Sequence, residues 1–409
     1  MFASRSRADT SAVVKSIADD YWAFVLRSNP EAATSLGEYQ YNDQLPEYSI
    51  VHAEADKKMA LALIERLKAL DVASLNESDS LDRALLLANL EDSVRSADLK
   101  MYEMPIDQFN GVHIAIPQIA TFAPFDSVKH YEDYVARLRQ IPGRFEQLTA
   151  TLRQGMQDKL MPPKYLLEKT VVQCRDLADK AGDKSAFSAS VLHFPNTIPA
   201  PDQKRLHDSV IAAVDGEVRP AYRKLEQFIA SEYAPHGRLE EGYWALPDGE
   251  ERYRFNVHTQ TTSKMTAGEI HSLGLAQVAD LEAQILALAK KAGYQNSKSF
   301  TKAVYADPKL KAKTREDILN NFRHYIEAME PKLPQLFGRL PKGKLLVTSV
   351  PEYMEKDGST QYIQGTPDGS RKGQVWVVTY DPPHHDVLDD EATAYHEGVP
   401  GHHLGCHPA

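Results

Sequence analysis

The residues best suited to chemistry lie near the end of the chain, where histidines are concentrated. Six of the 15 histidines fall in the last 26 residues: His384, His385, His396, His402, His403 and His407. Zinc peptidases of the HExxH type use two neutral imidazoles as ligands, and the glutamate beside the first histidine acts as general base on the bound water. The pair His396–Glu397 matches the first half of that arrangement.

The second histidine does not occupy the usual fourth position, because Pro400 stands there. Proline removes a helical hydrogen bond and clashes with the preceding turn, and Gly401 adds backbone freedom. We therefore expect a bulged or broken turn that brings His402 to the second ligand position. His403 lies on the same face of an unbroken helix, but seven residues of helix rise by about 10.5 Å. The spacing favours His402 over His403, and a surface cluster without metal is the alternative.

A catalytic zinc site needs a third protein ligand and an open position for water. Candidates in this part of the chain are His384, His385, Glu391 and His407. Glu391 is equally suited to orient a ligand imidazole or to serve only as an acid in a first helical turn. Nucleophilic-serine and P-loop chemistry are disfavoured, because neither G-x-S-x-G nor GxxxxGK[ST] occurs.

Most of the chain is predicted to be helical, with a small β-sheet near the metal-binding helix. The predicted strands are 344–350 and 374–380, both rich in β-branched and aromatic residues. A last helix should begin near 387–390 and carry the His396–Glu397 pair. The order of the motifs also suggests that 374–380 is an edge strand beside this helix, where an extended peptide can pair with it.

A change in composition over 235–254 predicts a boundary between an N-terminal helical region, 1–240, and a region bearing the histidine cluster, 241–409. Two capping boxes mark helix starts in the second region, at Thr266–Glu269 and Thr314–Asp317. The first of these helices should bury an apolar stripe formed by Val278, Leu281, Ile285 and Leu288.

The composition is that of an ordinary globular chain with a formal net charge of −10, which disfavours nucleic acid as a partner. Two cysteines exclude a disulfide framework. No apolar stretch approaches the ~18 residues of a membrane span. The polar start is not a signal peptide and predicts a cytoplasmic protein, whereas a trimmed mature terminus would fit a periplasmic or exported one.

These residues resemble a bacterial family, domain of unknown function 885, along nearly the whole chain. The most specific match is the segment from His396-Glu397 to His402-His403-Leu404. Other matches are Thr261-Thr262, Glu269-Ile270-His271, Gly274-Leu275, and Asp368-Gly369-Ser370-Arg371 with Gly373. The family is related to zinc carboxypeptidases, so the resemblance implies a mostly helical, zincin-like architecture with a deep cleft and peptidase activity. Many members are exported, often as lipoproteins.

The resemblance also implies that the loop around Arg371 lies beside the metal site. There Arg371 could bind a substrate carboxylate or stabilise developing negative charge, although an Asp-Gly-Ser-Arg segment alone indicates only a turn. Tyr362 is a weaker candidate for the same role. The family supplies a later glutamate as the third ligand, but no glutamate follows His403 here. We therefore expect a truncated relative with apolar surface exposed in its C-terminal half, and self-association through it.

Taken together, the sequence predicts a zinc-dependent metallopeptidase that acts on short peptides. Glu397 is the predicted general base and Arg371 a possible substrate anchor, and His396, His402 and His403 are the candidate Zn²⁺ ligands. The alternatives are a catalytically inactive relative and a helical binding protein without enzymatic activity.

Overall fold

The structure is a computed structural model in which residues 7–109, 111–341, 343–350, 355, 359–366, 369 and 371–406 are described. The chain forms two compact units, one comprising 1–34 with 38–264 and the other 35–37 with 265–409. The division thus falls after Lys264, later than the predicted boundary at 240/241. Arg252 explains the difference. Its buried guanidinium donates hydrogen bonds to the carbonyl oxygens of Leu99 and Pro247, and these bonds connect the helix that contains Arg252 to the first unit.

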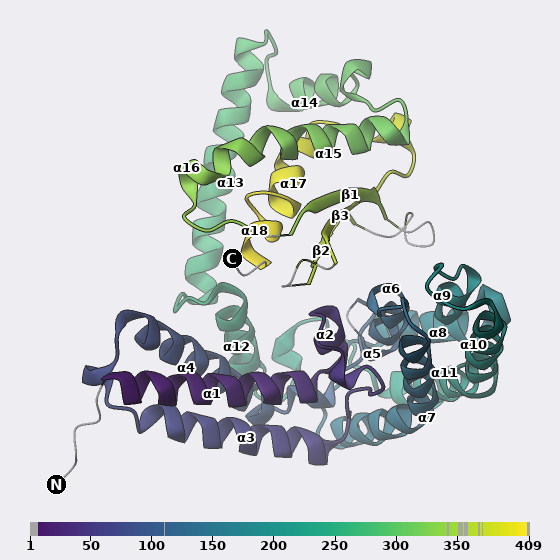
Figure 1. The fold of residues 1–409 in the computed structure, drawn as a ribbon. Coiled ribbons are helices and arrows are strands. Elements are labelled where there is room, and N and C mark those ends of the chain that lie inside the picture. The colour runs from purple at the N-terminus through teal and green to yellow at the C-terminus, as the bar shows by residue number, and fades with distance from the viewer. Residues whose placement is uncertain are drawn as a thin grey trace. The chain divides into compact units, whose positions relative to one another are not determined.

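The first unit is built from helices (Figure 1). Two π-helical turns, Val214–Val218 and Ile229–Tyr233, flank its helix α11. Its α-helices are α1 (Arg7–Ser28), α2 (Pro30–Ser35), α3 (Ile50–Lys68), α4 (Glu77–Asp98), α5 (Val112–Ala115), α6 (Ile119–Phe122), α7 (Val128–Gln157), α8 (Lys164–Asp179), α9 (Ala189–Leu192), α10 (Ala200–Ala213), α11 (Arg219–Phe228) and α12 (Gly249–Thr261).

Two apolar cores hold the first unit together. In the smaller core, α1, α3 and α4 pack around buried residues that include Ile17, Leu63 and Leu90. In the larger core, α7, α8, α10 and α11 surround buried aromatic side chains such as Tyr134 and Tyr222. Burial raises the pKa of both tyrosine hydroxyls, and each hydroxyl donates to a backbone carbonyl oxygen, so neither is left unsatisfied in the core.

The second unit combines helices with a small sheet. Its elements are α13 (Ala267–Lys291), α14 (Ser297–Tyr305), α15 (Arg315–Met329), α16 (Leu333–Leu336), β1 (Leu345–Ser349), β2 (Gln361–Ile363), β3 (Gly373–Val377), α17 (Asp390–Glu397) and α18 (His402–Cys406). Both predicted capping boxes are confirmed, with Thr266 at the start of α13 and Thr314 at the start of α15.

The sheet has the strand order β1-β3-β2. Strands β1 and β3, which the sequence predicted, pair in parallel with Leu345 opposite Gly373, and β2 pairs antiparallel to β3 with Tyr362 opposite Val375. The prediction that 374–380 forms an edge strand is therefore wrong. This run lies at the centre of the sheet because the short strand β2, which the sequence did not predict, covers its other side.

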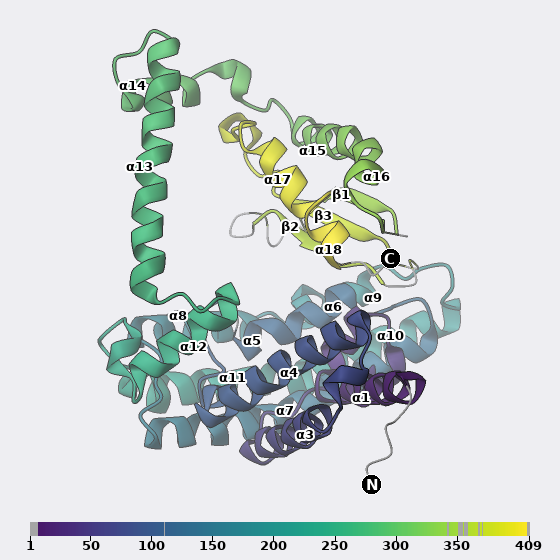
Figure 2. The same ribbon diagram turned by 90° about the vertical axis from the view of Figure 1, so that its left-hand side faces the viewer.

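A compact core positions the C-terminal helices. Helix α15 packs against both α17 and β1 (Figures 1 and 2). Its side chains Phe322 and Ile326 are buried with Val375 of β3, Ala394 of α17 and Val399 of the turn after α17. Helix α17 is thus fixed on one side by α15.

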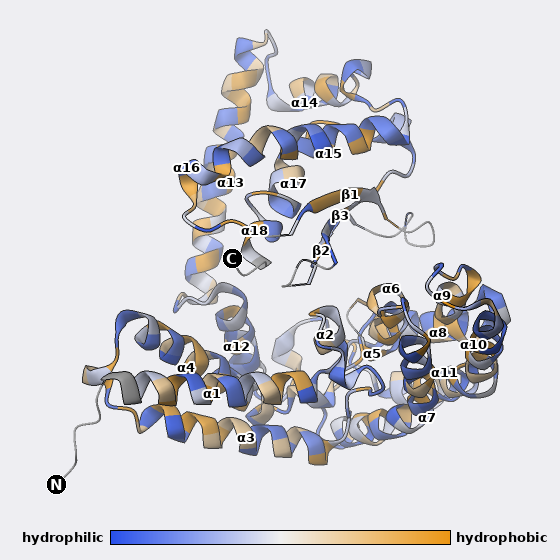
Figure 3. Ribbon diagram, in the orientation of Figure 1, coloured by the Kyte–Doolittle hydropathy of each residue, from blue (hydrophilic) through white to orange (hydrophobic). Residues whose placement is uncertain are grey.

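The apolar stripe on α13 is exposed, contrary to the prediction that it is buried. Val278, Leu281, Ile285 and Leu288 are each at least 40% accessible, and Ala289 is the buried residue of this helix. Figure 3 shows apolar residues along the length of α13. Helical spacing correctly identified an apolar face, but spacing cannot supply the partner that would cover it.

The structure confirms the predicted fold class, a mainly helical protein with one small sheet. Among the described residues, no helix combines the length and the apolar character that crossing a membrane requires.

Candidate metal centre

A non-helical turn between two helices brings the candidate ligands together. Helix α17 ends at Glu397 and α18 begins at His402, so the predicted broken turn is confirmed. The Gly401 N–H donates to the carbonyl oxygen of Tyr395 at 2.9 Å, which folds the turn back on α17. A Cβ atom on Gly401 would overlap the carbonyl oxygen of His396, so this position requires glycine.

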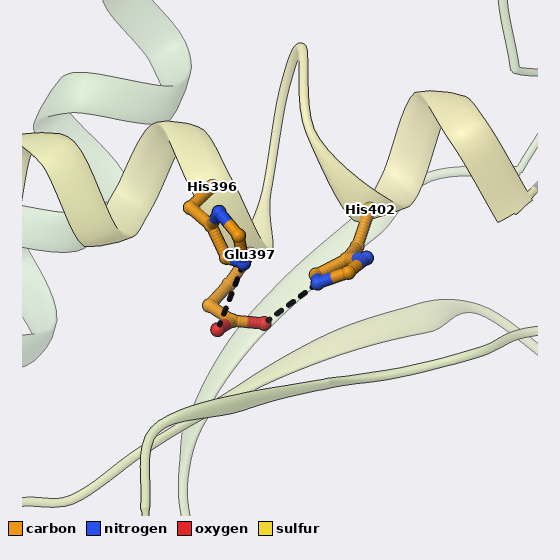
Figure 4. Close-up of side chains that lie close together, drawn as sticks. All are labelled: His396, Glu397 and His402. Atoms are coloured by element: carbon orange, nitrogen blue, oxygen red, sulfur yellow. Dashed lines mark ion pairs between the residues drawn. The ribbon is translucent and has the colours of Figure 1, made fainter. Parts of the chain in front are cut away.

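His396, Glu397 and His402 form one group whose ligand atoms all lie within 4.8 Å of one another. The Glu397 carboxylate lies between the two imidazoles, with its oxygens 4.0 Å from Nε2 of His396 and 3.9 Å from Nε2 of His402 (Figure 4). The two rings are nearly perpendicular, with centroids 4.7 Å apart. The imidazoles are 69% and 49% exposed, whereas the Glu397 side chain is only 13% exposed. Solvent therefore reaches both imidazoles.

Glu397 is held in place by the edge strand of the sheet. The backbone N–H of Tyr362 in β2 donates to its Oε2 at 2.8 Å. Because an ordered donor fixes one oxygen of the carboxylate, Glu397 is oriented before any ligand binds. From the sequence, Tyr362 was a candidate only through its hydroxyl group. A strand of three residues gives no indication that the backbone amide of Tyr362 contacts Glu397.

His403 is not part of this group. Its side chain is buried, with Nδ1 3.1 Å from the Tyr362 hydroxyl and Nε2 3.0 Å from the carbonyl oxygen of Gly343. Both of its ring nitrogens are therefore occupied within the protein. Of the two tandem histidines, the structure brings His402 beside His396, and it places His403 against the sheet.

The proposed third ligands have other partners. His385 contacts Asp390 at 2.7 Å, and Asp390 is buried at the start of α17, where it also accepts a hydrogen bond from Asn321 of α15. His384 lies 2.9 Å from Asp381 and is exposed.

Glu391 is also turned to another partner, since it accepts a hydrogen bond from Tyr395. Burial, together with this bond, raises the pKa of the Tyr395 hydroxyl. His407 falls outside the described residues. None of the described candidates joins the group of His396, Glu397 and His402.

Arg371 binds the backbone of its own unit. Its guanidinium donates to the carbonyl oxygen of Gln364 at 3.2 Å and to that of Ser35, a residue that clusters with the second unit. Its backbone N–H donates to the Thr366 hydroxyl at 2.9 Å. These bonds fix the loop next to β2. Asp368 and Ser370 of the same motif lie outside the described residues.

The donor set suits zinc. Two imidazoles and a carboxylate are ligand types that zinc binds at about 2.0–2.2 Å. Two nitrogens on one tetrahedral ion lie about 3.4 Å apart at those bond lengths. Atoms within 4.8 Å of one another thus need to approach by at most about 1.5 Å, which exposed imidazoles achieve by rotation.

Comparison with known proteins places the chain in a family. The model of a family described as bacterial protein of unknown function (DUF885) matches residues 30–407. No curated protein matches the sequence. A crystal structure of the "putative lipoprotein" from Colwellia psychrerythraea is similar with a TM-score of 0.88 at 18% identity, over 98% of this chain and 72% of that one.

A "putative lipoprotein of unknown function" from Shewanella oneidensis has a TM-score of 0.63 at 16% identity, again over 98% of this chain and 72% of that one. At such low identity these two likenesses concern the fold alone. The family match, in contrast, covers most of the sequence. The chain therefore belongs to the DUF885 family of bacterial proteins of unknown function.

Proposed function

We propose that this chain carries the metal-binding and general-base residues of a zinc-dependent peptidase. The observation that supports this most is the group formed by His396, Glu397 and His402, in which the two imidazole Nε2 atoms lie 4.0 Å and 3.9 Å from the oxygens of one carboxylate. The residue types and their order agree with those of HExxH-type peptidases once the broken turn is taken into account.

In this proposal His396 and His402 hold the ion, which when bound supplies a Lewis acid for the scissile carbonyl. Glu397 accepts a proton from the attacking water and transfers it to the leaving amine. The hydrogen bond from the Tyr362 N–H keeps one carboxylate oxygen fixed while the other faces His396. Partial burial limits the rotamers of Glu397, which suits a base that must act at a fixed position.

The structure favours His402 over His403 as the second ligand, since both nitrogens of His403 already have partners. It does not favour Arg371 as a substrate anchor, because its guanidinium is directed to two carbonyl oxygens. Short peptides are the proposed substrates, and the exposed imidazoles leave the site open to them.

The competing proposal is a relative that binds metal without catalysing hydrolysis. It is favoured by one observation: in the part of the chain that the structure describes, the only carboxylate grouped with the two imidazoles is Glu397 itself. If Glu397 served as a ligand, no general base would remain in this group.

Zinc content and peptide hydrolysis distinguish these proposals. We expect about one zinc per chain after exhaustive dialysis, lost in His396→Ala and in His402→Ala. His384→Ala is the matched control, since His384 is an exposed histidine of the same unit whose partner is Asp381. Glu397→Gln should keep its zinc and lose hydrolysis of short peptides. Loss of zinc in Glu397→Gln would instead favour a ligand role, and no zinc in the unaltered protein would refute both proposals.

A second copy of the chain is the partner that the exposed face of α13 suits best. Val278, Leu281, Ile285 and Leu288 follow the 3-4-3 spacing of a coiled-coil seam, with β-branched residues alternating with leucine. That alternation favours pairing of two helices. We propose that this face mediates the self-association expected from the sequence.

A further inference from the structure

Three hydrogen bonds link Gly343, the buried His403, Tyr362 and the general base proposed above. The carbonyl oxygen of Gly343 can only accept, so the Nε2 atom of His403, 3.0 Å away, carries the proton. In the neutral ring, Nδ1 is then an acceptor and receives the hydrogen bond from the Tyr362 hydroxyl at 3.1 Å. The backbone N–H of the same tyrosine donates to Glu397 at 2.8 Å. Gly343, His403 and Glu397 are therefore linked through Tyr362, whose hydroxyl bonds the histidine and whose backbone amide bonds the carboxylate.

Tyr362 is the residue at which these hydrogen bonds meet the candidate metal centre. Its ring lies nearly parallel to that of His402, at an interplanar angle of 16° with centroids 6.3 Å apart. It also contacts the His403 ring, with centroids 5.7 Å apart. One side chain thus borders both tandem histidines, while its backbone amide holds the carboxylate. A shift of Tyr362 would displace all three groups together.

The sheet leaves space for this arrangement only because residue 373 is glycine. A Cβ atom on Gly373 would lie 2.5 Å from the Tyr362 hydroxyl oxygen and 2.8 Å from Nδ1 of His403. Gly373 is in β3, directly beside the strand that carries Tyr362. A glycine that belongs to the recognised motif is therefore explained by the close approach of tyrosine and histidine above it.

We infer that Tyr362 and His403 form a positioning brace for Glu397, and that the two adjacent histidines have separate tasks. His402 faces the metal, and His403 fixes the hydroxyl of Tyr362, so that the Tyr362 amide is presented to the carboxylate. Its effect on metal binding rests on the proposed function, whereas the hydrogen bonds of His403 can be tested without any metal.

The metal-dependent test compares zinc dissociation constants, measured by competition with a chromophoric chelator, in the full chain. We expect Tyr362→Phe and His403→Ala each to raise the constant about 10-fold, as loss of outer contacts to a metal site usually does. His402→Ala should abolish binding. Tyr325→Phe is the matched control, since Tyr325 packs in the same unit against Tyr395. Abolition of binding by His403→Ala, or equal constants for Tyr362→Phe and Tyr325→Phe, would overturn the inference.

The metal-free test reads the imidazole nitrogens of His403 directly. Long-range ¹H–¹⁵N spectra of the histidine rings should show His403 as a neutral ring protonated on Nε2, and Tyr362→Phe should shift its Nδ1 signal while Tyr325→Phe leaves it unchanged. Gly373→Ala should produce the same shift as Tyr362→Phe. A ring protonated on Nδ1, or an Nδ1 signal insensitive to Tyr362→Phe, would refute the brace. If the unaltered protein binds no zinc but these signals behave as expected, the brace stands and the peptidase proposal fails.

Discussion

Gly398→Ala tests whether the turn between α17 and α18 sets the geometry of the candidate site. Gly398 follows Glu397 directly and lies against α15. A Cβ atom there would be 2.6 Å from the carbonyl oxygen of Ala394 and 2.9 Å from Cδ1 of Ile326. The Ile326 side chain can rotate away, but the carbonyl belongs to the helix that carries His396. The backbone of the turn must therefore move instead.

The size of this movement follows from the contact distance. Carbon and carbonyl oxygen rarely approach closer than about 3.3 Å, so the turn must shift by about 0.7 Å. Metal sites tolerate deviations of about 0.2 Å in ligand distance. We therefore expect the zinc dissociation constant to rise by about 10- to 100-fold, as it does when groups that orient ligands are removed. Overpacking of this kind should also lower the free energy of unfolding by about 1–3 kcal/mol.

The assay is zinc competition combined with denaturant unfolding, with Gly405→Ala as the matched control. Gly405 lies in α18, and a Cβ atom there would have no heavy atom within 4 Å. That variant should bind zinc like the unaltered protein. Equal zinc affinity in the two variants would refute the reasoning, because the turn would then absorb the Cβ atom without moving His402.

Two further predictions concern other parts of the chain. Burial raises the pKa of Glu31 from its ordinary 4.5 to about 7. Between pH 4.5 and pH 7 the folded state therefore keeps a proton that the unfolded state has released. As a result, the free energy of unfolding falls as the pH rises from 4.5 to 7. Glu31→Gln should reduce this pH dependence and raise the free energy of unfolding at pH 8 by as much as about 3 kcal/mol. Denaturant unfolding at pH 5 and pH 8 measures both effects. A pH dependence equal to that of the unaltered protein would contradict the prediction. In α13, Leu281→Gln combined with Ile285→Gln should reduce binding of a hydrophobic dye and shift sedimentation towards monomer, whereas Val51→Gln, at another exposed apolar position, should change neither.

Local signals predicted the elements of this fold well. The capping boxes at Thr266 and Thr314 start helices as expected, because each satisfies backbone donors through residues three positions apart. The two strands rich in β-branched residues also form. The sequence did not predict which elements pack or pair with one another in the folded structure. Strand β2 has only three residues, and its place in the sheet depends on β3, which lies ten residues later in the chain. The stripe on α13 shows the same limit, since its spacing is helical whether or not a partner covers it.

The candidate site was predictable in its composition and only partly in its geometry. His396 and Glu397 follow from one motif, and Pro400 and Gly401 signal the break that places His402 beside them. The hydrogen bond from the Tyr362 amide to Glu397 could not be predicted, because any residue except proline has a backbone N–H and the residue type does not reveal its partner. Arg371 illustrates the opposite case. The family resemblance suggested that it binds a substrate carboxylate, but its guanidinium donates to carbonyl oxygens of the protein.

The tandem histidines explain why the break matters. Consecutive residues in a helix point about 100° apart, so His402 and His403 cannot both face one ion. In an unbroken helix, His403 would share the face of His396 but lie about 10.5 Å further along the axis, so neither tandem histidine could bind one ion together with His396. The turn before α18 changes the direction in which the side chains of α18 point relative to those of α17. As a result, His402 is half exposed beside Glu397, and His403 is buried against Tyr362. Because one histidine turns outward, its neighbour must turn into the sheet, and a buried imidazole there requires partners for both nitrogens. Gly343 and Tyr362 supply those partners, which is why the break, the sheet and the orientation of the base form a single structural unit.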